Sequence, residues 1–482
     1  MGKTAQRKLF GTDGIRGLAN AYPMNSEVAM QVGAATAQVL LRRMGGQKRT
    51  TYPNPRVIIG KDTRISSYML ELAIASGICS RGADVLLVGP LPTPAVAYLA
   101  KSMRADAGIM ISASHNAYED NGIKIFDHDG YKLPDELEHE IEKNALAAVG
   151  ATDFSARALP THDRIGRAVR IDDAQGRYME ALKNLTPSGF NLDGMTVVID
   201  CAHGAGYKVA PMLFKELGAK VVKRGVEPSG TNINLRSGAL HPEVAAGAVV
   251  EFHAQIGVSL DGDADRVILC DEKGEKVDGD QIMGICALEL KARGQLRKDT
   301  VVSTPMSNMG LELMLKANGI ALERVPVGDR YVMEAMRAGG FSFGGEQSGH
   351  IIFHDYASTG DGILGALKVL EIMKRTGKAL SELKKSVKLL PQVREDLRVR
   401  EKLPIADIPK AAKLIQEAEK KLAGRGRVFV RYSGTEPLVR VMMEGDDLAE
   451  IRKECKKIAA AFEEAIGEKK RAKGSGTAEK RK

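Results

Sequence analysis

The sequence VIIG at residues 57–60 opens the pattern that decides the fold. A polar loop follows it, then a helical stretch to Arg81 and a second apolar run, Asp84-Val-Leu-Leu-Val-Gly89. The same pattern recurs from Val197-Val-Ile-Asp200 to Val222 and from Val301-Val-Ser303 to Gly328. Short apolar runs that alternate with helical periodicity predict βαβ units with buried parallel strands. Three copies in one chain predict three related α/β domains.

The pattern changes after residue 390. Helical periodicity covers Ile408–Leu422 and Leu448–Phe462, and strand-like runs cover Gly424–Tyr432 and Leu438–Glu444. This order predicts a smaller α+β domain with a strand pair. The lysine-rich end, residues 467–482, has no apolar stripe, and we expect it to be disordered.

The positive charge of the chain is concentrated at its two ends. The 482 residues carry a formal net charge of +9, of which residues 1–8 contribute +3 and residues 467–482 contribute +5. The body between them is nearly neutral, and aromatic residues make up only 5% of the chain. A nucleic-acid-binding face needs a basic surface with aromatic residues, so we expect no nucleic-acid partner.

The lengths of the apolar runs and the placing of the cysteines indicate in which cellular compartment we expect the protein. The longest unbroken apolar run, Ala95–Ala100, is six residues, whereas a membrane helix needs about 20. The five cysteines are scattered with no C-x-x-C pair, and the basic N-terminus is not followed by the apolar stretch of a secretory signal. We therefore expect a cytoplasmic protein with reduced thiols and no membrane partner.

The segment Ser259-Leu-Asp-Gly-Asp-Ala-Asp-Arg266 lies between two apolar runs and carries the clearest chemical signal. In extended backbone its aspartates, Asp261, Asp263 and Asp265, would all project to one side. Such clustered carboxylates repel one another unless a cation lies among them, and hard oxygen ligands suit Mg²⁺ or Ca²⁺. A solvated acidic turn without metal is the alternative. An EF-hand, with Glu272 as its twelfth position, is disfavoured because Arg266 stands where that loop needs glycine.

Four other segments are ambiguous when each is taken alone. Ser112-Ala-Ser-His-Asn116 could hold a nucleophile and a base, but an ordinary capped turn uses the same residues. Arg431-Tyr-Ser-Gly-Thr435, with Arg440 on the next strand, has the parts of a phosphate cradle or of a plain hairpin. The loops at residues 344–350 and 10–17 are glycine-rich turns that indicate little alone.

Taken together and in order, these segments resemble one family, the α-D-phosphohexomutases. The resemblance runs from about Phe10 to Phe462 and rests on five motifs, FGTDGIRG, ISASHN, DGDADR, GEQSGH and RYSGTEP. It implies four domains around a central cleft, three of related α/β fold with mixed sheets and a smaller α+β fourth. We place these domains at residues 1–163, 164–269, 270–386 and 387–466, followed by the basic tail 467–482.

The resemblance also implies a role for each matching residue. Ser114 matches the serine that is phosphorylated in the active enzymes, although Ser112 is an equal candidate by chemistry alone. The three aspartates, with the phosphoserine at 114, match the Mg²⁺ ligands. Three residues match positions near the reacting oxygens, where a general acid/base or charge clamp is expected, with Lys124 as the leading candidate: Arg16, Lys124 and His350. The expected substrate contacts are Glu346, Ser348, Arg431, Ser433, Gly434, Thr435 and Arg440.

The implied reaction is phosphoryl transfer from the serine to a phosphosugar, through a bisphosphate such as glucosamine 1,6-bisphosphate or glucose 1,6-bisphosphate. The sequences of three motifs are most similar to those of one branch of the family, whose members interconvert glucosamine 6-phosphate and glucosamine 1-phosphate: GEQSGH, RYSGTEP and VGDRYV (Val327–Val332). Glucose or mannose phosphates are the alternative substrates, and a non-catalytic sugar-phosphate-binding protein is a further alternative. The sequence departs from the family pattern at Ala117, where the family commonly has proline. This difference removes no chemical group from the expected site. We expect a monomer or a homodimer.

Overall fold

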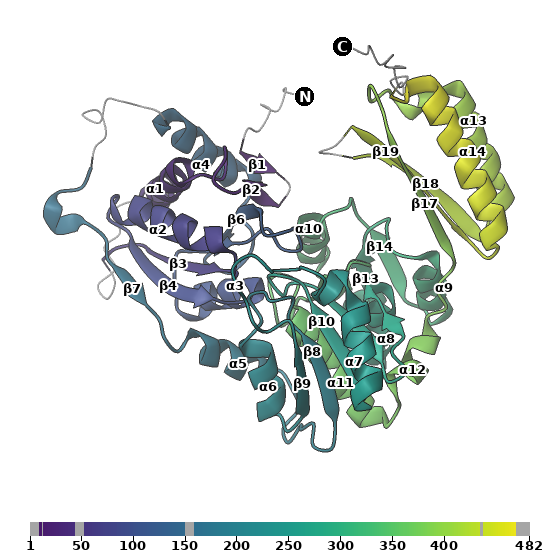
Figure 1. Ribbon diagram of the computed structural model, residues 1–482, viewed down its shortest axis with the longest axis horizontal. Coiled ribbons are helices and arrows are strands. Elements are labelled where there is room, and N and C mark those ends of the chain that lie inside the picture. Colours follow the sequence, from purple (N-terminus) through teal and green to yellow (C-terminus); the bar gives the residue numbers. More distant parts are fainter. Residues whose placement is uncertain (1–8, 12, 44–52, 150–158, 434–436, 469–482) are drawn as a thin grey trace, which may run out of the picture. The chain divides into compact units, whose positions relative to one another are not determined.

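The computed structural model describes residues 9–11, 13–43, 53–149, 159–433 and 437–468. It divides into two compact units, one of residues 1–307 with 314–387 and one of residues 308–313 with 388–482. Figure 1 shows their elements in chain order. The described residues contain no helix long and apolar enough to cross a membrane.

The first sheet of the larger unit has seven strands in the order β1-β2-β6-β5-β3-β4-β7. The quoted run VIIG lies in β3 (Arg56–Lys61), where all six residues are buried. β3 pairs in parallel with β4 (Asp84–Pro90) through α2 (Ile65–Cys79), as the sequence predicted. The other elements are β1 (Phe10–Gly11), β2 (Gly14–Leu18), β5 (Ala107–Ile111), β6 (Asp120–Asp127), β7 (Ala168–Arg170), α1 (Ser26–Arg43), α3 (Thr93–Ser102) and α4 (Asp135–Ala148).

The second sheet has five strands in the order β12-β11-β10-β8-β9. β8 (Thr196–Asp200) and β9 (Lys220–Arg224) form the second parallel pair, joined through α6 (Val209–Glu216). β10 (Ile256–Leu260) is parallel to β8, whereas β11 (Val267–Asp271) returns antiparallel to β10. The remaining elements are β12 (Lys276–Val277), α5 (Ala174–Asn184) and α7 (Pro242–Phe252).

The third sheet has four strands in the order β14-β13-β15-β16. β13 (Thr300–Ser303) is parallel to β14 (Ala321–Arg324), and β15 (Phe343–Gly345) is antiparallel to β16 (Ile351–Phe353). The three predicted parallel units are therefore confirmed, each within a mixed sheet. The remaining helices are α8 (Gly279–Ala292), α9 (Met309–Ala317), α10 (Asp329–Gly339), α11 (Gly362–Thr376) and α12 (Leu380–Leu383).

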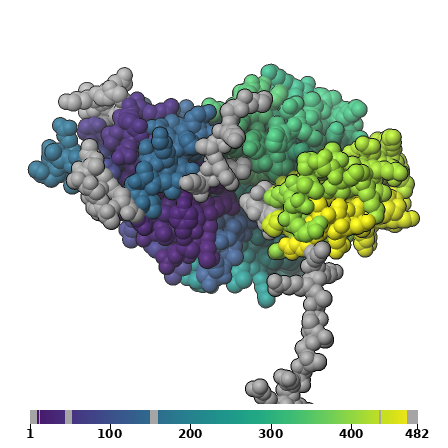
Figure 2. Space-filling view, turned by 90° about the horizontal axis from the view of Figure 1, so that it is seen from above, coloured from purple at the N-terminus to yellow at the C-terminus, as the bar shows by residue number. Residues whose placement is uncertain are grey.

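The smaller unit has three strands, in the order β17-β19-β18. β18 (Gly426–Tyr432), β19 (Leu438–Gly445), α13 (Pro409–Leu422) and α14 (Leu448–Ile466) match the predicted elements. The predicted strand pair was incomplete, because β17 (Gln392–Arg398) adds an edge strand whose alternate residues are exposed and charged. The two helices cover one face of the sheet in Figure 1, and the surface of this unit is coloured lime to yellow in Figure 2.

Candidate active site

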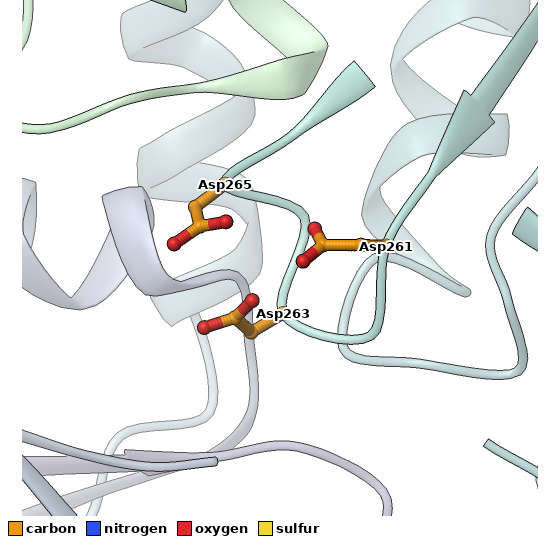
Figure 3. A group of neighbouring side chains, drawn as sticks. All are labelled: Asp261, Asp263 and Asp265. Atoms are coloured by element: carbon orange, nitrogen blue, oxygen red, sulfur yellow. The ribbon is translucent and has the colours of Figure 1, made fainter. Parts of the chain in front are cut away.

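The three aspartates of the DGDADR segment lie in the loop between β10 and β11 (Figure 3). They are buried, and one carboxylate oxygen from each lies within 4.8 Å of those of the other two. The loop is a tight turn and not the extended backbone that the spacing suggested, because Leu260 and Val267 pair across the antiparallel strands on either side. Ala264 accordingly adopts a φ of 57° and donates its N–H to Asp261 O. The carboxylates therefore converge because the chain folds back on itself.

The positive side chains of this group gather beside Asp265, with Lys124 Nζ at 3.4 Å, His350 Nδ1 at 3.7 Å and Arg266 Nε at 3.8 Å from its carboxylate. Burial and the neighbouring Asp265 and Asp263 raise the pKa of Asp261 well above its usual value. Asp263 Oδ1 is buried and has no hydrogen-bond partner among the described residues. Three converging carboxylates, one of which has an unpartnered buried oxygen, fit a hard divalent cation such as Mg²⁺ or Ca²⁺. The EF-hand alternative fails in the structure too, because Glu272 instead accepts from the Ser381 N–H at 3.2 Å.

Lys124, on β6, extends into the aspartate group with a side chain that is 2% exposed. Its Nζ lies 2.9 Å from Asp263 Oδ2 and 3.4 Å from Asp265 Oδ2. Burial alone would lower the pKa of Lys124, but Asp13, Asp263 and Asp265 outweigh burial and raise it well above its usual value. These carboxylates therefore favour the charged form of Lys124.

Ser114 lies in the loop after β5 (residues 112–119, here called the serine loop) and faces the loop that carries the three aspartates (residues 261–266, here called the metal loop). Its Oγ donates to Asp261 Oδ2 at 2.7 Å and lies 3.3 Å from Nδ1 of His115. Burial and the nearby Arg266 and Arg16 lower the pKa of His115 to about 4, so this ring is neutral at pH 7. The Ser114 backbone has a φ of 52°, an uncommon conformation for a residue other than glycine.

Ser112 has different partners from Ser114, although only one residue separates them. Its Oγ donates to Asp62 Oδ2 at 2.6 Å and accepts from the Ser114 N–H at 2.9 Å. Asp62 also accepts from Arg64, and both of these side chains are fully buried. The geometry thus separates two serines that are equivalent by chemistry, because only Ser114 contacts the aspartate group.

The GEQSGH loop connects β15 to β16 and brings His350 to the same group. His350 is 1% exposed, and its Nδ1 lies 3.7 Å from Asp265 Oδ1. Burial lowers the pKa of His350, but the carboxylates of Asp265, Asp329 and Glu346 outweigh burial and raise it. Ser348 is exposed and its Oγ donates to Glu346 Oε2 at 3.4 Å. The loop thus presents a carboxylate and a hydroxyl beside the buried histidine.

Arg16, on β2, contacts the serine loop through Nη1, which donates to Ala113 O at 3.4 Å. It also pairs with Asp13, a residue of the same FGTDGIRG motif. Asp13 in turn pairs with Lys132, whose Nζ lies 2.5 Å from Asp329 Oδ2. Sequence reasoning placed Arg16 near the site and overlooked this chain of ion pairs, whose members are far apart in the sequence.

The remaining predicted substrate contacts lie in the smaller unit. Arg431 on β18 pairs directly with Arg440 on β19, and like charges opposite one another destabilise a sheet. Burial and the charges of Arg440 and Arg394 lower the pKa of Arg431. Ser433 is buried and its N–H donates to Leu438 O at 2.8 Å. Gly434 and Thr435 lie outside the described residues.

Within the larger unit, the structure therefore brings together seven of the predicted residues around one point: Ser114, Arg16, Lys124, His350, Asp261, Asp263 and Asp265. Sequence reasoning missed three groups that contact them. Thr93 donates its hydroxyl to Asp263 Oδ2 at 2.6 Å. Arg64 and Asn234 donate to carbonyls of the serine loop. Isolated polar residues of this kind carry no motif, so only their contacts identify them.

Comparison with known proteins agrees with this geometry. Models of four domains described as phosphoglucomutase/phosphomannomutase match the chain: alpha/beta/alpha domain I over residues 7–149, domain II over 176–274, domain III over 278–389 and the C-terminal domain over 396–461. The matches follow the chain in order and cover most of it. The chain therefore belongs to the phosphoglucomutase/phosphomannomutase family.

Curated relatives are similar over nearly the whole chain. The phosphoglucosamine mutase of Pelobacter propionicus is 54% identical over 463 residues, which are 96% of this chain and 100% of that protein. The phosphoglucosamine mutase of Anaeromyxobacter dehalogenans is 55% identical over 466 residues, with the same coverage of both chains.

Solved structures show the same fold at lower sequence identity. A phosphoglucomutase/phosphomannomutase family protein from Burkholderia thailandensis superposes with a TM-score of 0.77 at 23% identity, over 95% of this chain and 97% of that one. The N-acetylphosphoglucosamine mutase of Aspergillus fumigatus, solved in complex with GlcNAc-6P and magnesium, gives a TM-score of 0.64 at 19% identity, over 95% and 96%. Both likenesses establish the four-domain fold of this family.

Proposed function

We propose that this chain is an isomerase that interconverts glucosamine 6-phosphate and glucosamine 1-phosphate, with Ser114 as the residue that carries the transferred phosphoryl group. The observation that carries the proposal is the contact between Ser114 Oγ and Asp261 Oδ2 at 2.7 Å, within a buried group of three aspartates. A serine hydroxyl in this position can both transfer a phosphoryl group and complete a metal site. The names of the curated relatives supply the sugar.

Mg²⁺ is the cation that best fits the aspartate group within this reaction. Asp261, Asp263 and Asp265 would hold it together with a phosphoryl oxygen on Ser114, which gives the oxygen-only ligand set that Mg²⁺ prefers. The raised pKa of Asp261 and the unpartnered Oδ1 of Asp263 support a cation here. When bound, Mg²⁺ neutralises negative charge on the transferring phosphoryl group.

The reaction then consists of two transfers of opposite direction. A free hydroxyl of the sugar monophosphate attacks the phosphoryl group on Ser114, the bond from phosphorus to Ser114 Oγ breaks, and the proton of the sugar hydroxyl is passed on to Ser114 Oγ. The products are a sugar bisphosphate and a free serine hydroxyl. After the sugar turns over, its other phosphoryl group returns to Ser114 Oγ. Lys124 and Arg16 provide positive charge beside the serine loop, and such charge lowers the barrier to phosphoryl transfer.

Proton transfer and sugar binding draw on the other predicted residues. The raised pKa of His350 favours its protonated form, which suits a donor to the leaving oxygen. We assign sugar-hydroxyl binding to Glu346 and Ser348. The phosphate that does not react is assigned to Arg431, Ser433, Gly434, Thr435 and Arg440, since the adjacent Arg431 and Arg440 side chains favour an anion between them.

The setting that we propose is the cytoplasm. Every cysteine of the chain lies in the described part, and none of the five is in a disulfide. Reduced thiols are usual in the cytoplasm, and glucosamine phosphates are the only partners that the proposal requires.

A coupled assay of the purified protein tests the function. The protein is first phosphorylated with glucose 1,6-bisphosphate and then supplied with glucosamine, glucose or mannose phosphate in Mg²⁺ buffer. We expect kcat/KM to be highest for glucosamine phosphate. Equal or greater efficiency on glucose 1-phosphate would contradict the choice of sugar, and no activity on any of the three would contradict the mutase assignment.

A further inference from the structure

Asn234 lies in the loop between β9 and α7, far in sequence from the serine loop that it contacts. Its side-chain Nδ2 donates to Ser114 O at 2.9 Å and to Asn116 O at 2.9 Å. The residue is 7% exposed, so both hydrogen bonds are shielded from water. One amide thus bonds two carbonyls of the segment that carries the proposed nucleophile.

The backbone of Asn234 is also held in place. Its N–H donates to Ala202 O at 2.9 Å, in the loop that follows β8. Its φ is 59°, in the left-handed region that asparagine tolerates better than most residues. Asn234 is therefore tied to the second sheet through its backbone and to the serine loop of the first sheet through its side chain.

The metal loop fits closely against this contact. A Cβ atom added at Gly262 would lie 2.5 Å from Ser114 O and 2.8 Å from Asn234 Nδ2, so no side chain fits there. Gly262 lies between Asp261 and Asp263. The serine loop, the Asn234 amide and the metal loop therefore meet without room for a shift of one against another.

Arg64 provides a second set of donors to the same carbonyls. Its Nη2 donates to Ser114 O at 3.0 Å and to Asn116 O at 2.8 Å. Arg64 lies in the loop after β3 of the first sheet, whereas Asn234 lies in the loop after β9 of the second. Of these two donors, Asn234 is therefore the one that ties the backbone of the serine loop to the domain that carries the aspartates, beside the contact of Ser114 Oγ with Asp261. Such a link fixes the separation of the two halves of the site.

We propose that Asn234 is a positioning residue for phosphoryl transfer, which sets the place of Ser114 Oγ relative to Asp261, Asp263 and Asp265. The inference rests on the proposed function of this site and adds a residue to it. Asn234 contacts none of the reacting atoms. Because phosphoryl transfer depends mainly on position and charge, a shift of the serine by about 1 Å costs on the order of 100-fold in rate.

Two substitutions at Asn234 test the proposal. Asn234→Asp keeps the shape and the tolerance of positive φ but loses the amide donors, and it places a carboxylate against two carbonyls. Asn234→Gly removes the side chain, adds no charge and adopts the same φ without strain. Asn232, two residues earlier, is the matched control, because its Nδ2 donates to Glu227 O at 3.0 Å within its own loop.

We expect both Asn234 variants to lower kcat by roughly 10- to 100-fold while KM for the sugar phosphate stays within about twofold. Phosphorylation of Ser114 by a hexose 1,6-bisphosphate, followed by intact mass, should slow in parallel. Asn232→Asp and Asn232→Gly should stay within about twofold of wild type in both measurements. A purely structural role would lower thermal stability without this separation of kcat from KM.

Amide hydrogen exchange gives a readout that needs no activity. Exchange in residues 113–117 should increase in the Asn234 variants and remain unchanged in the Asn232 variants. Unchanged exchange and kcat in both Asn234 variants would overturn the inference while leaving the mutase assignment intact. A wild-type protein that is inactive on every hexose phosphate would instead overturn the proposed function, whatever the exchange result.

Discussion

The Asp62–Arg64 pair and the aspartates of the metal loop are both buried, and both contact the serine loop. Asp62 accepts four hydrogen bonds, from the Arg64 N–H and Nε and from the hydroxyls of Ser67 and Ser112. Arg64 donates its remaining N–H groups to four backbone carbonyls of residues 114–120. One charge of each sign is present, and each is fully hydrogen-bonded.

The aspartates of the metal loop are less completely paired. Lys124 Nζ lies within 3.5 Å of Asp263 and Asp265, and His350 Nδ1 and Arg266 Nε lie 3.7 and 3.8 Å from Asp265 Oδ1. Among the described residues, however, Asp263 Oδ1 has no hydrogen-bond partner. Burying a charge is costly unless it is paired, so the Asp62–Arg64 pair can support the loop unaided, whereas the aspartate group has an unpartnered oxygen that could hold a cation. The two groups differ in how completely they are paired and not in burial.

The largest expected effect on activity comes from substitution of one of the two serines that contact these groups, Ser114 beside the aspartates and Ser112 beside Asp62. Ser114→Ala should lower activity by roughly 1,000-fold or more, because it removes the atom that carries the phosphoryl group. Ser112→Ala should cost about 1–3 kcal/mol of unfolding free energy by leaving an Asp62 oxygen without one donor. Mass spectrometry should still find phosphate on Ser114 in that variant. Phosphate on Ser112, with activity surviving in Ser114→Ala, would reverse the assignment.

Removing one charge from each group compares their stabilities directly. Arg64→Met should cost about 3–5 kcal/mol, because it leaves the Asp62 carboxylate buried without its cation. Asp261→Asn should change the metal-free stability by less than about 1 kcal/mol, since the amide keeps an acceptor and one of three like charges is lost. Calorimetry in EDTA measures both variants. A destabilisation of Asp261→Asn equal to that of Arg64→Met would remove the distinction between the two groups.

Asp361 is an intermediate case, with three hydrogen-bond donors and no ion pair with any residue that the structure describes. Its carboxylate accepts from the N–H groups of Ile363 and Leu364 and from the Tyr178 hydroxyl at 2.6 Å. Burial raises the pKa of Asp361 to about 6. The stability from its protonated form is present below about pH 4 and is lost as pH rises through about 6, by roughly 2–3 kcal/mol.

Asp361→Asn isolates this contribution, because asparagine also caps a helix and accepts from the tyrosine. The unfolding free energy of wild type relative to this variant should fall between pH 4 and pH 7. A difference that does not vary with pH would mean that the hydrogen bonds alone compensate the buried charge.

Metal binding gives the smallest expected effect. Mg²⁺ at ten times its dissociation constant should stabilise the wild-type protein by about 1.4 kcal/mol. The same addition should not stabilise Asp261→Asn or Asp263→Asn to this extent, whereas Ser112→Ala should respond as wild type does. The melting temperature measured at constant ionic strength checks this. An equal shift in the aspartate variants would place the cation elsewhere.

The sequence predicted the helices and strands whose apolar residues form a continuous run or recur at helical spacing. β3, β8 and β13 are short apolar runs, and α13 and α14 have helical spacing, so their types followed from local pattern. β17 was missed because its residues, QVREDLR, are mostly polar and form an edge strand. The three aspartates were found from their spacing, although their convergence depends on a tight turn and not on extended backbone.

What the sequence determined by itself is the repeated parallel unit, the acidic loop and the five ordered motifs, because each is written in adjacent residues. The motif selected Ser114 over Ser112 by resemblance, and the tertiary structure alone gave the physical reason, since the two serines differ in partners and not in chemistry. It alone also revealed the contacts of Arg64 and Asn234 with the serine loop. These depend on the pairing of strands far apart in the chain, and no local pattern records which distant groups such pairing brings within hydrogen-bond distance.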